Sequence, residues 1–181
     1  INTFSETISS ITGSELYTFV EKIIAVVSGT PNMKEKYRNI LYREDELIFN
    51  QDRGIYSAMN IGLKICDPGQ IIFLNSGDLL TPKMSSYDWT KLKKTLLFRP
   101  KILIDGKQYT ARSHEVLNHQ NIVYFLESKK SFVFFDEEKG PLADAEWIKT
   151  VSSDSLKVNE NLAIFTYGGI STRPSFSHAI K

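Results

Sequence analysis

A helix, an apolar strand and a polar loop between residues 52 and 78 constrain the fold more than any other stretch. Apolar residues recur every three or four positions from Ile55 to Cys66, which predicts one amphipathic helix. After a turn, Ile71 to Leu74 has the length and unbroken apolar character of a strand buried on both faces. The polar loop Asn75-Ser76-Gly77-Asp78 follows at once. Because open α/β sheets bind ligands at the carboxyl ends of their strands, this loop is a candidate site.

The rest of the first half repeats this alternation. Helices are predicted at 5–11 and 32–41, and strands at 19–27 and 47–49. Alternating helices and strands argue for a parallel sheet with right-handed crossovers. A further strand before residue 5 would complete the unit, and it is missing or reduced in this sequence.

The second half changes character. Its predicted elements are helices at 88–97 and 142–151 and strands at 101–104, 107–111, 122–126, 132–135 and 162–165. Asp105-Gly106 joins the first two of these strands as a two-residue hairpin turn. We therefore expect one α/β domain over residues 1–181, with a mainly parallel central sheet flanked by helices and antiparallel strands added by the second half.

Composition narrows the functional classes. Lys plus Arg is 22 and Asp plus Glu is 21, and a net charge of +1 gives no support to nucleic-acid binding. The single Cys66 excludes an intrachain disulfide and a cysteine zinc site, fits a reducing compartment, and lies on the apolar face of its helix. No apolar run approaches the roughly 18 residues of a membrane span, and no signal peptide is expected. Ile1 is not an initiator Met, so we expect the sequence to be part of a longer product.

Asp78 is a candidate metal ligand. It follows a strand expected to be buried, so its carboxylate must be solvated, paired or bound to a metal. Divalent cations that bridge diphosphates favour carboxylate oxygens, and phosphate and water fill their remaining positions. An ordinary loop aspartate is the alternative.

Two turns of the first half are candidates for a nucleotide site. Ser28-Gly29 follows a predicted strand, where free backbone N–H groups can face a phosphate, although the pattern alone is that of a strand-to-helix turn. Asp52 precedes Gly54 and is either the N-cap of the following helix or a residue facing a bound nucleotide.

Three polar residues of the second half are ambiguous by themselves. Asp144 and Glu146 lie two apart on a predicted helix and so face different ways, which leaves only one of them to enter a crevice. His119 precedes an apolar strand, the position of many hydrogen-bonded structural histidines.

Together these segments resemble the family-2 glycosyltransferases of GT-A fold, above all the bacterial group that builds capsule, colanic-acid and O-antigen sugars. That group typically shows Asp-Lys-Gly-Ile-Tyr-Asp-Ala-Met-Asn-Lys-Gly-Ile, then a strand ending in Phe-Leu-Asn-Ser-Gly-Asp. The matching residues here are Asp52, Gly54, Ile55, Tyr56, Ala58, Met59, Asn60, Gly62 and Phe73 to Asp78. Later matches are His119-Gln120, Phe135-Asp136 with Ala143-Asp144, and Gly168-Gly169-Ile170-Ser171. Order and spacing agree over roughly residues 5–172.

The resemblance implies an inverting glycosyltransferase of hexosyltransferase type that moves a sugar from a nucleotide-diphosphate sugar to an acceptor hydroxyl in bacterial surface polysaccharide biosynthesis. It implies Mg²⁺ or Mn²⁺ as cofactor and a saccharide or lipid-linked saccharide as acceptor. It also implies a cytoplasmic location, with peripheral association at the inner face of the cytoplasmic membrane. Residues 1–78 would form the nucleotide-sugar-binding half and residues 79–181 the acceptor-side half.

Carried over residue by residue, the resemblance assigns catalysis to Asp144, as the base, and to His119 beside it. It assigns metal binding to Asp78. The nucleotide-sugar site would contain Ser28, Gly29, Asp52, Gly54, Asn60 and Asn75.

The sequence departs from the pattern of this group at several positions. Many members have Asp where Ser28 stands, and often Asp where Ser57 and Gly77 stand. These departures and the missing first strand favour an alternative, a non-catalytic GT-A-like domain that binds a saccharide or a protein partner. A nucleotide-binding α/β domain with other chemistry, such as a nucleotidyltransferase, is a third option, and it predicts no role for Asp144.

Overall fold

A computed structural model of the chain describes residues 2–28, 33–42, 44–51, 54–82, 88–89, 91–114 and 118–167. The α-helices are α1 (Asn2–Thr12), α2 (Lys34–Arg38), α3 (Ile55–Ile65) and α4 (Ala143–Val151). The strands are β1 (Ile24–Ser28), β2 (Glu46–Asn50), β3 (Gly69–Ile72), β4 (Leu79–Leu80), β5 (Thr95–Phe98), β6 (Lys101–Ile104), β7 (Lys107–Thr110), β8 (Ile122–Leu126), β9 (Ser155–Val158) and β10 (Ala163–Thr166).

Three sheets carry both parallel and antiparallel pairs. β1 pairs with β2 in parallel register, with Ser28 opposite Asn50. A second sheet has the order β3-β8-β5-β9, in which β8 is antiparallel to both neighbours and β5 is parallel to β9. The third has the order β4-β10-β6-β7, and it includes the predicted Asp105-Gly106 hairpin. The expected mixed α/β architecture is therefore confirmed.

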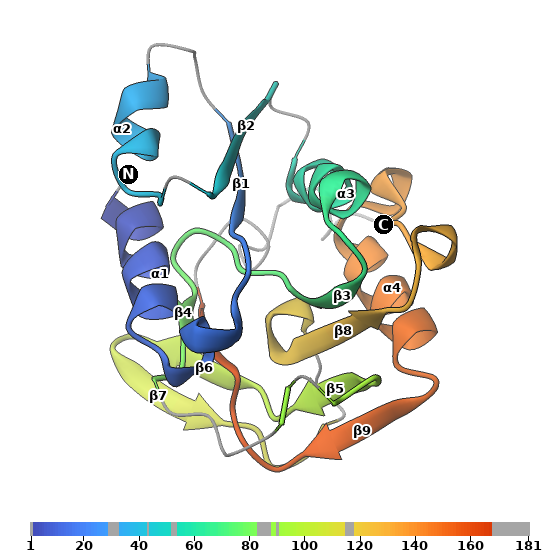
Figure 1. Ribbon diagram of the computed structural model, residues 1–181. Coiled ribbons are helices and arrows are strands. Elements are labelled where there is room, and N and C mark those ends of the chain that lie inside the picture. The colour runs from blue at the N-terminus through green and yellow to red at the C-terminus, as the bar shows by residue number, and fades with distance from the viewer. Residues whose placement is uncertain are drawn as a thin grey trace, which may run out of the picture.

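Helices cover two sides of these sheets. Figure 1 shows α1 and α2 on the left of the molecule and α3 and α4 on the right, with β1 and β2 between α2 and α3 and with β8 and β5 below α3. None of the helices in the described part of the chain is long and apolar enough to cross a membrane.

Three groups of buried side chains form the core. The first joins α3, β8 and α4 through residues such as Leu63, Leu126 and Trp147. The second surrounds β5 and includes Phe98 and Leu162, neither of which is exposed to solvent. The third lies between α1, α2 and β1 and contains Phe4, Ile8, Ala25, Tyr37 and Leu41. The amphipathic faces that the sequence predicts for α1 and α3 are the faces that enter these groups, whereas α4 buries Trp147, Ile148 and Val151 and leaves Leu142 at its N-terminal end exposed.

Several predicted elements are wrong in position or type. Residues 95–98 form strand β5 and not the end of a helix: the strand pairs with β8 on one side and β9 on the other, and all four of its residues are buried. Residues 132–135 form no strand, and the strand predicted from residue 19 begins at Ile24, after a 3₁₀ helix at Glu15–Phe19. The strand after α3, predicted at Ile71 to Leu74 and buried on both faces, is β3 (Gly69–Ile72) and is only half-buried. It pairs antiparallel with β8, whereas the sequence predicted a parallel sheet. No strand precedes residue 5 in the described residues, since α1 begins at Asn2.

Candidate active site

Asn75, His119 and Asp144 form one chain of hydrogen bonds. The Asn75 Nδ2 atom lies 3.2 Å from His119 Nε2, and His119 Nδ1 lies 3.0 Å from Asp144 Oδ2. Asn75 belongs to the loop after β3, His119 opens the short 3₁₀ turn His119–Asn121 before β8, and Asp144 lies in the first turn of α4. Three segments that are distant in sequence therefore meet at one point, as the resemblance predicts for His119 and Asp144.

The hydrogen bonds select one tautomer of His119. An amide N–H of Asn75 donates, so His119 Nε2 must accept and the ring proton must sit on Nδ1. The Nδ1–H group then donates to Asp144 Oδ2. Only 5% of the His119 side chain is exposed, so water does not compete for either ring nitrogen.

Asp144 has one oxygen occupied and one without a partner. Its Oδ1 atom is buried and accepts no hydrogen bond from any residue that the structure describes. A buried acceptor that stays unpaired is uncommon, and a catalytic role is one of the explanations for it. Glu146 points elsewhere and pairs with Lys139 at the surface, which confirms that only one of the two helix carboxylates enters the site.

Tyr56 lies beside Asp144. Burial, followed by the negative charge of Asp144, raises the pKa of the Tyr56 phenol to about 12, although the backbone N–H of Asp144 partly opposes this. Its ring stacks on Phe135 at 5.4 Å, which fixes its position. The phenol therefore stays neutral over the ordinary working range and can act as a hydrogen-bond donor there.

Asp78 is buried, with 3% of the residue exposed. Its Oδ2 accepts from Asn75 N at 3.1 Å and from Gln120 Nε2 at 2.9 Å, and its Oδ1 accepts from Thr166 N at 3.3 Å. Burial raises the pKa of the Asp78 carboxyl, and these three hydrogen bonds and the charge of His119 act in the opposite direction.

This geometry does not fit the predicted metal site. Asp78 Oδ2 already accepts two N–H groups and Oδ1 accepts one, and the residue is buried, whereas a bound Mg²⁺ usually keeps several waters around it. The described part of the chain contains no group of three or more His, Cys, Asp or Glu side chains arranged to hold a metal. The metal role of Asp78 stays a prediction without geometric support.

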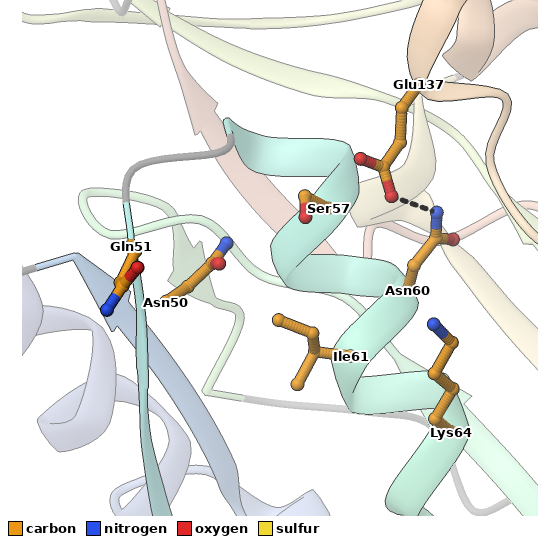
Figure 2. Close-up of a pocket in the computed structure, with 7 residues that line it drawn as sticks. All are labelled: Asn50, Gln51, Ser57, Asn60, Ile61, Lys64 and Glu137. Carbon is orange, nitrogen blue, oxygen red and sulfur yellow. Dashed lines mark hydrogen bonds between the residues drawn. The ribbon is translucent and has the colours of Figure 1, made fainter.

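Asn60 lines a pocket between β2 and α3. The pocket has a volume of about 270 Å³ and is lined by Asn50, Gln51, Ser57, Asn60, Ile61, Lys64 and Glu137. Figure 2 shows Asn50 reaching from β2 toward α3, and Glu137 above Asn60. The Asn60 amide donates to Phe135 O and to Glu137 Oε1 and accepts from Phe135 N. Its nucleotide-sugar role stays a prediction, and its visible role is to fasten α3 to Phe135.

The other predicted donor residues are only partly described. Ser28 is exposed at the carboxyl end of β1, beside Asn50 of β2. Gly54, and not Asp52, occupies the N-cap position of α3, with a φ of +84° that favours glycine. Outside the described residues lie Gly29, Asp52 and the motif at residues 168–171. Within them, no hydrogen bond joins Ser28 or Gly54 to the Asn75–His119–Asp144 chain.

Sequence reasoning gave no role to three residues that hold this site together. Gln120 and Thr166 bind Asp78, and the Thr7 hydroxyl accepts from Gly77 N at 2.9 Å and donates to Asp78 O at 2.8 Å. Gln120 was visible as half of the His-Gln pair in the resemblance. Thr7 and Thr166 carry no sequence signal, because each meets the loop only in the folded chain.

Comparison with known proteins identifies the fold. No protein-family model and no curated protein sequence matches this chain. Among solved structures, TarS of S. aureus superposes on 93% of the chain with a TM-score of 0.66 at 16% identity. The structure of S. aureus TarS 1–349 in complex with UDP covers 90% with a TM-score of 0.65 at 16% identity. The structure of TarS 1–349 alone covers 91% with a TM-score of 0.67 at 15% identity.

The chain covers 35% of the first of these proteins and 56% of the other two, so it spans from about a third to little over half of their length. TarS is a glycosyltransferase. This chain shares with these structures a mixed α/β fold, with parallel and antiparallel sheets flanked by helices.

Proposed function

We propose that this chain belongs to an inverting glycosyltransferase that transfers a sugar, of hexose type, from a nucleotide-diphosphate sugar to an acceptor hydroxyl. The observation that carries the proposal is Asp144, which has one oxygen held by His119 and the other buried without a partner, on a glycosyltransferase fold. A base that must take a proton from a substrate needs an oxygen that no protein group occupies.

Asp144 is the proposed general base. The acceptor hydroxyl gives its proton to Asp144 Oδ1 while its oxygen attacks the anomeric carbon of the donor sugar. The bond from that carbon to the diphosphate breaks, and the nucleoside diphosphate leaves with the electron pair. One displacement inverts the anomeric configuration. His119 Nδ1–H holds Oδ2 throughout, so it orients the base and stabilises charge on it.

The donor site is proposed on the other side of the loop after β3, from Ser28, Gly29, Asp52, Gly54, Asn60 and Asn75. A nucleoside diphosphate as ligand is suggested by the UDP bound to the similar TarS structure. Mg²⁺ or Mn²⁺ would neutralise charge on the leaving diphosphate, although the buried Asp78 carboxylate already accepts three N–H groups of the protein.

The biological setting is also a proposal. The structural likeness to TarS and the sequence resemblance both suggest the synthesis of a bacterial surface polysaccharide. We propose a saccharide or lipid-linked saccharide as acceptor and a position at the cytoplasmic face of the membrane, because a lipid-linked acceptor is confined to that surface.

The test replaces the proposed base in the intact protein. Asp144→Asn keeps the size of the side chain and its bond to His119 but removes the basic oxygen, so sugar transfer should fall by about 10²- to 10⁴-fold. Calorimetric titration with UDP and GDP, each with Mn²⁺, should give the same affinity in the variant as in the wild type. Glu146→Gln is the matched control on the same helix, and it should transfer at the wild-type rate.

Two outcomes would contradict the proposal. Retained transfer in Asp144→Asn removes Asp144 as the base. If neither nucleotide binds the wild-type protein at millimolar concentration, the enzyme proposal fails, and the non-catalytic GT-A-like domain that binds a saccharide or a protein partner takes its place.

A further inference from the structure

Hydrogen bonds fasten the loop at residues 75–78 to α1, to the 3₁₀ turn His119–Asn121 and to β10. Thr7 of α1 bonds to Gly77 N and to Asp78 O, and the Thr166 hydroxyl of β10 donates to Gly77 O at 2.9 Å. Inside the loop, the Asp78 carboxylate accepts from Asn75 N. A loop held at Asn75, Gly77 and Asp78 in this way is rigid in the folded state.

The Asp78 carboxylate is the centre of this arrangement. Its three N–H donors come from Asn75, from Gln120 and from Thr166, and the bonds to the last two span 42 and 88 residues of sequence. A metal ion that displaced any of these donors would leave a buried N–H group unpaired, at a cost of about 1–3 kcal/mol for each group.

The neighbouring position supplies no alternative ligand. Gly77 has a φ of +104°, a conformation that side chains other than glycine's rarely adopt. The acidic residue that related sequences often carry there would therefore strain this turn. Residue 77 therefore has no carboxylate, and the carboxylate of Asp78 is buried and accepts three N–H groups.

Asp78 instead contacts the Asn75–His119–Asp144 chain at two points. It holds the backbone N–H of Asn75, whose side chain donates to His119 Nε2. It also holds the side chain of Gln120, the residue next to His119 in the same 3₁₀ turn. Both bonds fix where the imidazole lies relative to its partners.

We infer that Asp78 is a positioning residue for the His119–Asp144 pair and does not ligate a metal. It holds Asn75 in the place that selects the Nδ1–H tautomer of His119, and that tautomer donates to Asp144. The catalytic part of the inference rests on the proposed function, because Asp78 would affect the reaction only by orienting Asp144, the proposed base. Its structural part, the link from Asp78 to the His119 tautomer, is independent of the reaction.

Two variants separate positioning from metal binding. Gln120→Leu removes one donor and leaves the Asp78 carboxylate intact, so a metal ligand at Asp78 would be kept or improved. Asp78→Asn removes the negative charge and cannot accept at every donor. If Asp78 positions His119, both variants act alike: kcat falls by about 10- to 100-fold while KM for the donor stays unchanged. Ser76→Ala, at an exposed position of the same loop, is the control and should behave as wild type.

Two further readouts accompany the kinetics in the intact protein. Nitrogen-15 NMR of the imidazoles, with His119 assigned through a His119→Gln variant, should show an Nδ1–H ring in the wild type and in Ser76→Ala. The signal should move toward a tautomer mixture in Asp78→Asn and Gln120→Leu. Any gain in UDP affinity with Mn²⁺ over EDTA should be the same in all four proteins.

The opposite pattern overturns the inference. The inference is wrong if three results occur together: Mn²⁺ strengthens UDP binding in the wild type, Asp78→Asn abolishes that gain, and the His119 signal is the same in all variants. If the wild type transfers no sugar at all, the proposed function fails, and the His119 tautomer in the two variants still decides whether Asp78 positions the ring.

Discussion

At the scale of single residues, hydrogen-bond partners separate aspartates that the sequence presents as equivalent. Asp78 and Asp144 were both candidates for chemistry. Asp78 has every oxygen occupied by protein N–H groups, whereas Asp144 keeps one oxygen without a partner in the described part of the chain. The sequence could mark both positions, but it could not show partners such as Thr166, 88 residues away from Asp78. The sequence shows where an acidic residue stands, but the folded chain decides which groups hydrogen-bond to its carboxylate oxygens.

Cys66 allows a clean test of burial at one residue, because the chain has no other thiol. Burial and the nearby Asp67 charge raise the pKa of the Cys66 thiol. At a given pH less thiolate is then present than in a free cysteine, so iodoacetamide should alkylate the native protein more slowly than the urea-unfolded protein. Mass spectrometry at several pH values measures both rates. Because the folded pKa is the higher one, thiolate formation also opposes folding, and stability contributed by the protonated thiol is lost as pH rises through the folded pKa. Equal native and unfolded alkylation rates at every pH would contradict this.

At the scale of elements, local patterns predicted most helices and strands and failed where contacts between distant segments decide the structure. The apolar spacing of α1, α3 and α4 depends only on neighbouring residues, and all three helices were found. Leu92 and Leu96 have the same spacing, yet residues 95–98 form β5 because β8 and β9 lie on either side of it. Phe132 to Phe135 looked like a strand, but the backbone of Phe135 bonds to Asn60 instead. Pairing between distant segments decided both cases.

Asn60 should therefore contribute to the free energy of unfolding, because its side chain bonds to both backbone groups of Phe135. Asn60→Ala leaves the N–H and C=O of Phe135 without their partner in a buried setting, so the free energy of unfolding should fall by about 1–3 kcal/mol. Urea unfolding followed by circular dichroism measures the change. Lys149→Ala, at an exposed position of α4, is the control and should stay within about 0.5 kcal/mol of wild type. A loss in Asn60→Ala no larger than in the control would show that Phe135 finds other partners.

At the scale of the whole molecule, the two halves assigned from the sequence are joined through their sheets. β3 of the first half pairs with β8 of the second half, and the Asp78 carboxylate accepts from Thr166 N of β10. The candidate site lies on this seam, since Asn75 comes from one half and His119 and Asp144 from the other. The sequence predicted the α/β architecture and the residues on either side of the boundary. It did not predict the antiparallel pairing that brings them together.

Stability should be unevenly distributed over this arrangement. β5 and β8 each have two strand neighbours, and β5 is buried along its whole length. β1 and β2 are only partly buried, and in the described residues each has the other as its strand partner. A two-stranded sheet depends on what packs against it, here α1, α2 and α3.

Native-state hydrogen exchange read by mass spectrometry should reveal this difference. Amides of 95–98 and 122–126 should exchange at least about tenfold more slowly than amides of 24–28 and 46–50, after correction for intrinsic rates, because local opening costs less where fewer buried contacts are lost. Mild urea should erase protection of β1 and β2 first. If all four segments lose protection together and to the same extent, the chain is one cooperative unit, and the β1–β2 pair is held as firmly as the sheet around β8.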